Sequence, residues 1–242
     1  MTHILIDGDI LIYQAASAVE KDFNWGDDLW SVAADMGEAK QLLQASIAEI
    51  EGALGATKTT LAVSANPTFR SQIWPAYKGN RKARKPVVFR ELREWSVREL
   101  GAIRWSLCEA DDVLGILATR DPEAVVVTVD KDLKGVPGRH WNPSKRTLLP
   151  VTVTQAEADE WHLIQSMAGD PTDGYAGIPG IGPVKAKKLL DKNGCSWETV
   201  VDAYKAADMT PEDAILNARL AKILTQDLWD EQRQLPILWT PR

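Results

Sequence analysis

Eight acidic side chains stand at positions where a folded chain could gather them into one site. They are Asp7, Glu109, Asp111, Asp112, Asp130, Asp132, Asp170 and Asp173. Without cations such a group is unfavourable, because two like charges about 4 Å apart repel by about 4 kcal/mol at an effective dielectric constant of about 20. Carboxylates and water are the ligands that Mg²⁺ and Mn²⁺ prefer, and a pair of such ions can activate water for phosphodiester hydrolysis. Taken singly, each acid is more ordinarily a helix cap, a turn former or a surface charge, so only the whole group indicates a metal site.

The predicted elements bring these acids together. Asp7 ends the first predicted strand, and Asp130 and Asp132 follow a Val-rich strand predicted over 124–129. Residues two apart in an extended chain project the same way, so Asp130 and Asp132 are expected to face one point. The remaining acids open a predicted helix or lie in a turn-rich loop. Because ligands bind at the carboxyl ends of strands in open α/β sheets, we expect one acidic centre there.

Strand and helix patterns alternate along the first part of the chain, which predicts an α/β fold with a mostly parallel sheet flanked by helices. Strands are expected over 4–6, 60–63 and 124–129, helices over 10–19, 38–54, 90–100 and 108–119, and a hairpin over 23–32. Later patterns are helical, at 155–168, 185–192 and 197–206 and from Thr210 onward. We therefore expect an α/β domain over 1–154 and a helical region over 155–242.

Charge is distributed unevenly along the sequence. The chain has a net charge of −6, yet residues 70–104 hold ten Lys and Arg against three Glu. This asymmetry favours a phosphate-binding surface beside a carboxylate cluster, although a solvated basic helix face would give the same pattern. The two cysteines, Cys108 and Cys195, are far apart, which argues against a disulfide scaffold or a cysteine metal site. The chain shows neither a signal peptide nor an apolar run long enough to span a membrane, so we expect a cytoplasmic globular protein.

Four motifs occur in a fixed order along the sequence. They are Ile6-Asp7-Gly8; Phe69-Arg70 with 75–81 (PAYKGNR); 109–112 (EADD) with 128–133 (TVDKDL); and 169–173 (GDPTD) running into 177–186 (GIPGIGPVKA). Over about residues 4–190 this ordered set resembles the flap endonuclease and 5′-nuclease family, particularly its phage and bacterial 5′→3′ exonuclease members. The resemblance implies a Mg²⁺-dependent, structure-selective 5′→3′ exonuclease or flap endonuclease that hydrolyses DNA phosphodiesters.

The resemblance also implies roles for particular residues. Two Mg²⁺ ions, for which Mn²⁺ can substitute, would be held by Asp7 and Asp111 with Glu109 and Asp112 close by, and by Asp130, Asp132 and Asp173 with Asp170 in support. Lys78 and Arg81 would act catalytically on the scissile phosphate from a basic arch at about 70–104. DNA contacts would extend to Arg70, Tyr77, Lys82, Arg84 and Lys85. An unpaired base could stack on Tyr77, but simple packing explains this residue equally well.

The segment 177–183 resembles the hairpin of a helix-hairpin-helix, expected at about 165–192. Gly180 and Gly182 would let backbone N–H groups approach a duplex phosphate, and Lys185 and Lys187 follow in the first half of a helix. Such a contact positions DNA without reading its bases. Family members often bind K⁺ at this hairpin. The alternative is an ordinary Gly-Pro loop.

Three features depart from the family pattern. Ser64-Ala65-Asn66 stands where the family usually has a further Asp, so Asn66 either replaces that ligand weakly or the ligand is missing. Asp173-Gly174-Tyr175 replaces the common Asp-Asn-Ile, which keeps the acid and changes its support. The hairpin from Trp25 to Trp30 has no counterpart.

Three other classes compete with this interpretation. A haloacid-dehalogenase-like phosphatase would use Asp7 as nucleophile and Asp9 as general acid, but leaves most of the acids unexplained. A nuclease-inactive DNA-binding protein predicts lost acids, and a PIN-like ribonuclease would lack the hairpin. We therefore expect a monomeric nuclease of a phage, active in the host cytoplasm on 5′ ends, flaps and junctions of DNA, RNA-primed ends included, during replication or primer removal.

Overall fold

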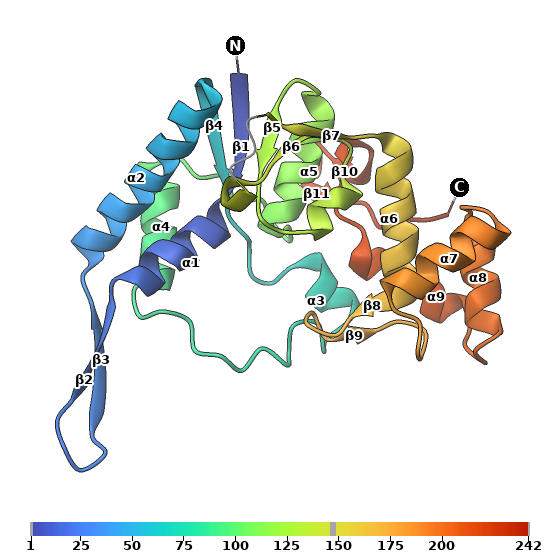
Figure 1. The fold of residues 1–242 in the computed structure, drawn as a ribbon, viewed down its shortest axis with the longest axis horizontal. Coiled ribbons are helices and arrows are strands. Elements are labelled where there is room, and N and C mark those ends of the chain that lie inside the picture. The colour runs from blue at the N-terminus through green and yellow to red at the C-terminus, as the bar shows by residue number, and fades with distance from the viewer. Residues whose placement is uncertain (1, 146–148, 242) are drawn as a thin grey trace.

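The computed structural model describes residues 2–145 and 149–241. A five-stranded sheet with the order β4-β1-β5-β6-β7 forms its centre (Figure 1). The strands are β1 (Thr2–Asp7), β4 (Ala56–Ala62), β5 (Val125–Val127), β6 (Gly138–Trp141) and β7 (Val151–Val153). All neighbours pair in parallel except β6 and β7, which are antiparallel. The expected mostly parallel α/β sheet is confirmed, whereas β6 and β7 were not predicted.

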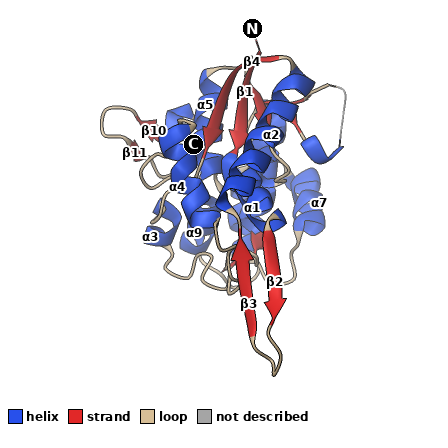
Figure 2. Cartoon of the chain, turned by 90° about the vertical axis from the view of Figure 1, so that its left-hand side faces the viewer, coloured by secondary structure: helices blue, strands red, loops and turns tan. Residues whose placement is uncertain are grey.

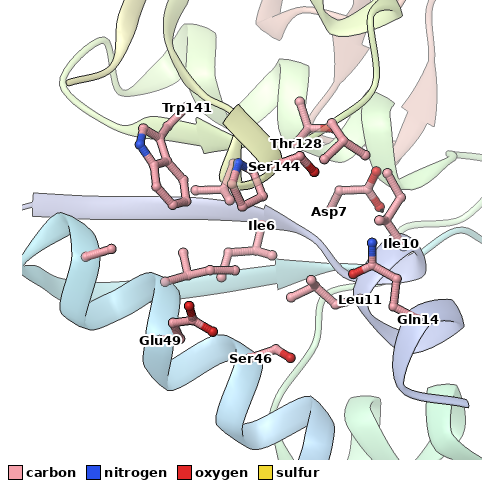
Figure 3. Close-up of a pocket in the computed structure, with 15 residues that line it drawn as sticks. Ile6, Asp7, Ile10, Leu11, Gln14, Ser46, Glu49, Thr128, Trp141 and Ser144 are labelled. Atoms are coloured by element: carbon pink, nitrogen blue, oxygen red, sulfur yellow. Dashed lines mark hydrogen bonds between the residues drawn. The ribbon is translucent and has the colours of Figure 1, made fainter. Parts of the chain in front are cut away.

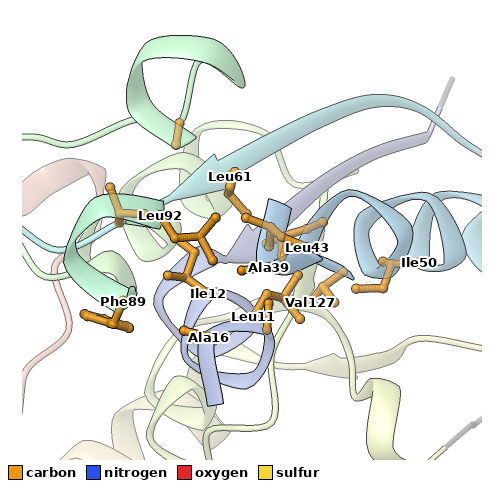
Figure 4. Close-up of a cluster of buried hydrophobic side chains, with 14 of the residues drawn as sticks. Leu11, Ile12, Ala16, Ala39, Leu43, Ile50, Leu61, Phe89, Leu92 and Val127 are labelled. Atoms are coloured by element: carbon orange, nitrogen blue, oxygen red, sulfur yellow. The ribbon is translucent and has the colours of Figure 1, made fainter. Parts of the chain in front are cut away.

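Helices cover both faces of this sheet. One face packs against α1 (Gly8–Ala18), α2 (Met36–Leu54) and α4 (Phe89–Glu99), and the other against α5 (Ala110–Arg120). Figure 4 shows the first of these clusters, with Leu11, Leu43 and Leu92 meeting between the helices. Because successive strand residues point to opposite faces, Ile4 and Ile6 join this cluster while Leu5 joins the α5 side. The apolar run over 4–6 in β1 is therefore what a strand covered on both faces requires.

The later part of the chain is helical, as expected. It contains α6 (Gln155–Ala168), α7 (Pro183–Asn193), α8 (Trp197–Lys205) and α9 (Pro211–Ala221), which share one apolar cluster. Thr154 caps α6 through the expected capping box with Glu157. The tail leaves this cluster: Ile223, Leu224 and the segment with η3 (Gln226–Leu228), β10 (Trp229–Asp230) and β11 (Leu235–Pro236) pack beside α5. The tail therefore contacts both parts of the fold, because its Trp239 also meets His162 of α6 and Trp197 of α8.

A two-stranded hairpin projects away from the body (Figures 1 and 2). It consists of β2 (Glu20–Asn24) and β3 (Trp30–Ala34), and its turn passes through Gly26 and Asp27 at positive φ. The predicted hairpin is therefore confirmed. Its indole rings at Trp25 and Trp30 are 69% and 59% exposed.

The basic segment 70–104, for which a helical arch was predicted, is helical only toward its two ends. It comprises the short α3 (Phe69–Ile73), a non-helical stretch over 74–88 and then α4. The stretch ends near the hairpin, where Arg84 pairs with Glu20 (2.8 Å) and the Val87 N–H donates to the same carboxylate (2.7 Å). Among the described residues, no helix is long and apolar enough to cross a membrane.

Candidate active site

Asp7 lies at the carboxyl end of β1 and caps α1, where its carboxylate accepts a hydrogen bond from the Ile10 N–H (3.3 Å). The side chain is almost completely buried. Burial, followed by the nearby charges of Asp9 and Asp130, raises the pKa of Asp7 to about 7. Asp7 therefore belongs to a crowded acidic centre, as its place at a strand end predicts.

Asp111, in the first turn of α5, faces the same centre. Its Oδ1 is buried and has no hydrogen-bond partner in the described parts of the chain. Burial raises the pKa of Asp111 well above its usual range, and the charges of Asp7 and Asp130 raise it further. A buried carboxylate oxygen facing two other carboxylates lacks the partner that a cation would supply.

Asp130 and Asp132 follow β5, but not in extended chain as predicted. The strand ends at Val127, and the 3₁₀ turn η1 (Asp132–Gly135) begins at Asp132. Asp130 accepts a hydrogen bond from the Asp132 N–H (2.8 Å), which is a local turn rather than a pair of parallel side chains. The two acids are still neighbours. Burial, and then the nearby charge of Asp130, raise the pKa of Asp132 to about 6.

One partner of this acidic centre was not predicted from the sequence. Gln165, on the buried face of α6, donates a hydrogen bond from Nε2 to Asp132 (2.7 Å). Asp170 is also near, since its charge contributes to the raised pKa of Asp132, although its own oxygen accepts from the Thr172 N–H (2.8 Å). The only sequence signal for Gln165 is that a polar residue stands at an inward-facing position of a predicted helix. This signal is weak.

Two cations lie against the remaining acids. The Lys78 ammonium contacts Glu109 (2.5 Å) and lies 3.7 Å from Asp173, and Arg81 forms an ion pair with Asp173. The Tyr77 hydroxyl lies 2.9 Å from both carboxylates. Burial opposes ionisation of Glu109, but Arg70 and Lys78 outweigh it and lower the pKa of this carboxyl. Over 2–145 and 149–241, no three His, Cys, Asp or Glu side chains already have a ligand arrangement for a metal ion. Lys78 and Arg81 now occupy Glu109 and Asp173.

The loop that carries Asp173 positions the segment that carries Lys78. The Lys78 N–H donates to the Asp173 carbonyl (2.7 Å), and the Trp74 indole donates to the Gly174 carbonyl (3.2 Å). Lys78 has a positive φ of 55°, a strained backbone conformation for a non-glycine residue. The loop therefore holds the ammonium beside the acids.

The comparisons with known proteins decide the family. The model of the 5′-3′ exonuclease N-terminal resolvase-like domain matches residues 2–158. The chain belongs to the 5′→3′ exonuclease family. It is 31% identical to the exodeoxyribonuclease of Enterobacteria phage T3, over 99% of this chain and 93% of that one. The exonuclease of Escherichia phage T7 is 32% identical over 98% and 93%.

This exonuclease also shares its fold with solved structures. A flap endonuclease of bacteriophage T5, solved with DNA and metal ions, superimposes with a TM-score of 0.67 over 92% of this chain and 89% of that one, at 13% identity. Family membership makes the protein a phosphodiester hydrolase that acts on DNA, and it excludes the phosphatase alternative.

Arg70 was predicted to contact DNA and Asp112 to lie at a metal ion, but both side chains are buried and paired with each other. Arg70 is 3% exposed and forms a two-pronged ion pair with Asp112 (2.6 and 2.9 Å). Its remaining donors reach the Leu220 and Lys222 carbonyls (2.8 and 2.7 Å). Asp112 is fully buried and also accepts from the Glu109 and Leu224 N–H groups. With its donors satisfied inside the fold, Arg70 is no DNA contact, and Asp112 has no oxygen left for a metal.

Tyr77 is likewise a buried residue and not a stacking platform. Its ring is 8% exposed and stacks on Tyr175, with ring centroids 6.4 Å apart. Burial raises the pKa of its hydroxyl far above the usual value, so the group stays protonated between the two acids. Of the two interpretations left open, packing is the correct one, and Tyr175 is the support that replaces the family's common residue.

The other predicted DNA contacts in this segment differ in their exposure and in whether they already have an ion-pair partner. Arg81 is 52% exposed although it pairs with Asp173. Lys82 and Lys85 are exposed as well, and Lys85 lies over the Phe89 ring (4.5 Å). Arg84 donates to both carboxylate oxygens of Glu20 at the base of the hairpin, so its guanidinium already has a partner.

The helix-hairpin-helix segment has an open backbone at its glycines. Gly180 has a φ of 73°, and a Cβ at Gly180 or Gly182 would meet no atom within 4 Å. Lys185 donates to the Gly180 carbonyl (2.8 Å). Lys187 pairs with Glu160 (2.9 Å) and Asp191 at the surface, and its DNA contact stays a prediction.

Two pockets flank the acidic centre. One, of about 510 Å³, opens beside Asp7 between α1, α2 and the β5–β6 edge, with Trp141 on one wall and Gln14 on another (Figure 3). The other is cationic and contains Asn66. Asn66 therefore lies among basic side chains.

Proposed function

We propose that this exonuclease cuts DNA at 5′ ends and flaps with the help of divalent cations, Mg²⁺ foremost, held at the carboxyl ends of β1 and β5. The observation that supports this most directly is the buried, unpartnered oxygen of Asp111, which faces Asp7 and Asp130. The T5 flap endonuclease has been solved with DNA and metal ions, which is consistent with such a site. Replication or primer removal by a phage is the proposed setting.

The acids divide into two proposed groups. Asp7, Asp111 and Asp130 would hold one cation, and Asp132, Asp170 and Asp173 the other, with Glu109 between them. Their mutual effects on pKa support this division, which moves Asp130 from the second predicted group to the first. When bound, such cations activate water for attack and stabilise the charge on the leaving oxygen of a phosphodiester. Asp112 is absent from both groups because Arg70 occupies it.

Lys78 and Arg81 are proposed to bind the scissile phosphate. Both lie at the rim, with side chains 27% and 52% exposed, and both now contact carboxylates that cations would neutralise. Once those acids bind cations, the ammonium and guanidinium are free to stabilise phosphate oxygens. Tyr77 holds Glu109 and Asp173 in place beneath them. The open glycine hairpin at Gly180 and Gly182 is proposed to contact duplex backbone, with K⁺ as a candidate ion there.

Cleavage of a 5′-labelled flap duplex with and without Mg²⁺ tests this function. We expect wild-type cutting near the junction or 5′ end only with Mg²⁺, and a loss of at least about 100-fold in Asp111→Asn, since a ligand is removed. Asp202→Asn, an exposed acid on α8, is the matched control and should retain full activity. DNA binding in EDTA and a thermal melt should be unchanged in Asp111→Asn; full cleavage by that variant would overturn the proposed site.

A further inference from the structure

The second pocket, of about 710 Å³, lies at the carboxyl end of β4. Its walls are the β4–α3 connection, helix α4 and residues 104–106. Four cations line it, namely Lys85, Arg90, Arg93 and Arg104, against one acid, Glu94. Ser64, Asn66 and Ser106 add neutral polar groups, and Ala65, Phe89 and Trp105 complete the lining. The pocket therefore has the composition of a site for an anion.

Much of this positive charge has no partner. Arg104 pairs with Glu94 (2.6 Å), but Lys85 and Arg90 form no ion pair with any described residue. Arg93 has only Asp9, at 4.0 Å, and its Nε is buried without a hydrogen-bond partner in the part of the chain that the structure covers. A buried donor left unsatisfied is unfavourable, and an anion in the pocket would supply the missing partner.

The pocket shares a wall with the acidic centre. Asp9 accepts a hydrogen bond from the Ser64 N–H (3.0 Å), and its charge also raises the pKa of Asp7. The Ser64 hydroxyl in turn accepts from the Ala110 N–H (2.9 Å), one residue before Asp111. A strand with a phosphodiester at Asp7 and Asp111 could thus place a neighbouring phosphate among Arg93 and Lys85.

We propose that this pocket binds a phosphate group of the 5′ strand, close along the strand from the phosphodiester that is cut. The inference rests on the proposed function and adds a second anchor, which would fix how far from the 5′ end the cut is made. The same chemistry fits a terminal 5′-phosphate and an internal phosphodiester. The guanidinium of Arg93 is the central donor, because its Nε is the unsatisfied group.

Binding of 3′-fluorescein-labelled single strands in EDTA tests the pocket without needing cleavage. Two strands are compared, identical except for a 5′-phosphate or a 5′-hydroxyl. Arg93→Gln removes the donor, and Asn66→Asp places a negative charge in the pocket at an exposed position with no change of size. Arg98→Gln, on the same helix but exposed and outside the pocket lining, is the control. Mg²⁺-dependent cleavage of the same strands annealed into flaps is followed in parallel.

We expect both pocket variants to weaken binding roughly tenfold or more, and the control by less than about threefold. A loss confined to the phosphorylated strand identifies the terminal phosphate, and an equal loss on both strands identifies an internal one. Binding by both pocket variants equal to that of Arg98→Gln would overturn the pocket assignment. A wild type that binds but never cuts in Mg²⁺ would contradict the proposed function, while the binding comparison still decides the pocket.

Discussion

Asp111 and Asp112 are adjacent in the sequence and have opposite surroundings. Asp111 is repelled by Asp7 and Asp130, whereas Asp112 is surrounded by donors from Arg70 and two backbone N–H groups. A charge repelled by its neighbours can be removed without loss of stability, but the loss of one partner of a buried ion pair leaves the other uncompensated. We therefore expect the loss of Asp111 to affect cleavage and the loss of Asp112 to affect folding.

We expect Asp112→Asn to lower the free energy of unfolding by about 3–5 kcal/mol, because the Arg70 guanidinium stays buried without a counter-charge. Urea denaturation followed by tryptophan fluorescence measures this. Asp111→Asn is the matched comparison and should unfold at or above the wild-type midpoint. Equal stability of Asp112→Asn and wild type would show that the Arg70 pair is not a structural one.

At the scale of elements, the loop β8 (Gly169–Asp170) to β9 (Tyr175–Ala176) holds the segment of Lys78 through Gly174. Gly174 has a φ of 77°, and a Cβ there would lie 2.8 Å from the Ala76 carbonyl oxygen and 3.4 Å from the Lys78 nitrogen. A side chain at this position would push the two segments apart. The glycine that departs from the family pattern is thus required by this close approach.

Gly174→Ala should lower cleavage at least about tenfold, since small displacements of catalytic groups are costly. It should also destabilise the fold by about 1–2 kcal/mol. Flap cleavage and thermal melts measure the two effects. Gly26→Ala is the control, because Gly26 has a φ of 90° but a Cβ there meets no atom within 4 Å. Equal cleavage by the two variants would contradict this positioning role of Gly174.

At the scale of the whole molecule, His162 joins three parts of the chain. On α6, its Nε2 lies 2.9 Å from the Ala218 carbonyl of α9, and its ring meets Trp239 of the tail edge-on (4.9 Å between centroids). Burial, and then the charge of Lys222, lowers the pKa of His162 to about 3. The ring is therefore neutral in the folded protein and protonates near pH 6.5 once the chain unfolds.

The unfolded state thus binds a proton that the folded state excludes between about pH 6.5 and about pH 3, so stability falls as the pH is lowered through this range. From about pH 7 to about pH 4.5, this one group should cost about 2–3 kcal/mol. His162→Gln keeps a donor near Ala218 and cannot titrate, so its loss between the two pH values should be smaller by that amount. Urea unfolding at both pH values with a chelator present measures it, and an identical pH dependence in the variant would contradict the assignment.

Much of the fold follows from local patterns. The buried runs at β1 and β5, the helix caps at Asp7 and Thr154, and the Gly26 turn are signals within a few residues, because strand burial, capping and turn formation are short-range effects. The two short strands β6 and β7 carry no such run, and their pairing was not predicted. The sequence also determined the family, through motifs whose order persists along the chain.

Only the tertiary structure decided which charged residues are free. Arg70, Asp112 and Tyr77 lie in the same motifs as Lys78 and Asp111, and residue type does not reveal that the first three are buried with partners inside the protein. The partner of Asp132 is Gln165, on a helix that follows much later in the sequence. Burial and pairing depend on contacts between distant segments, and these determine whether a charge faces DNA or holds the fold together.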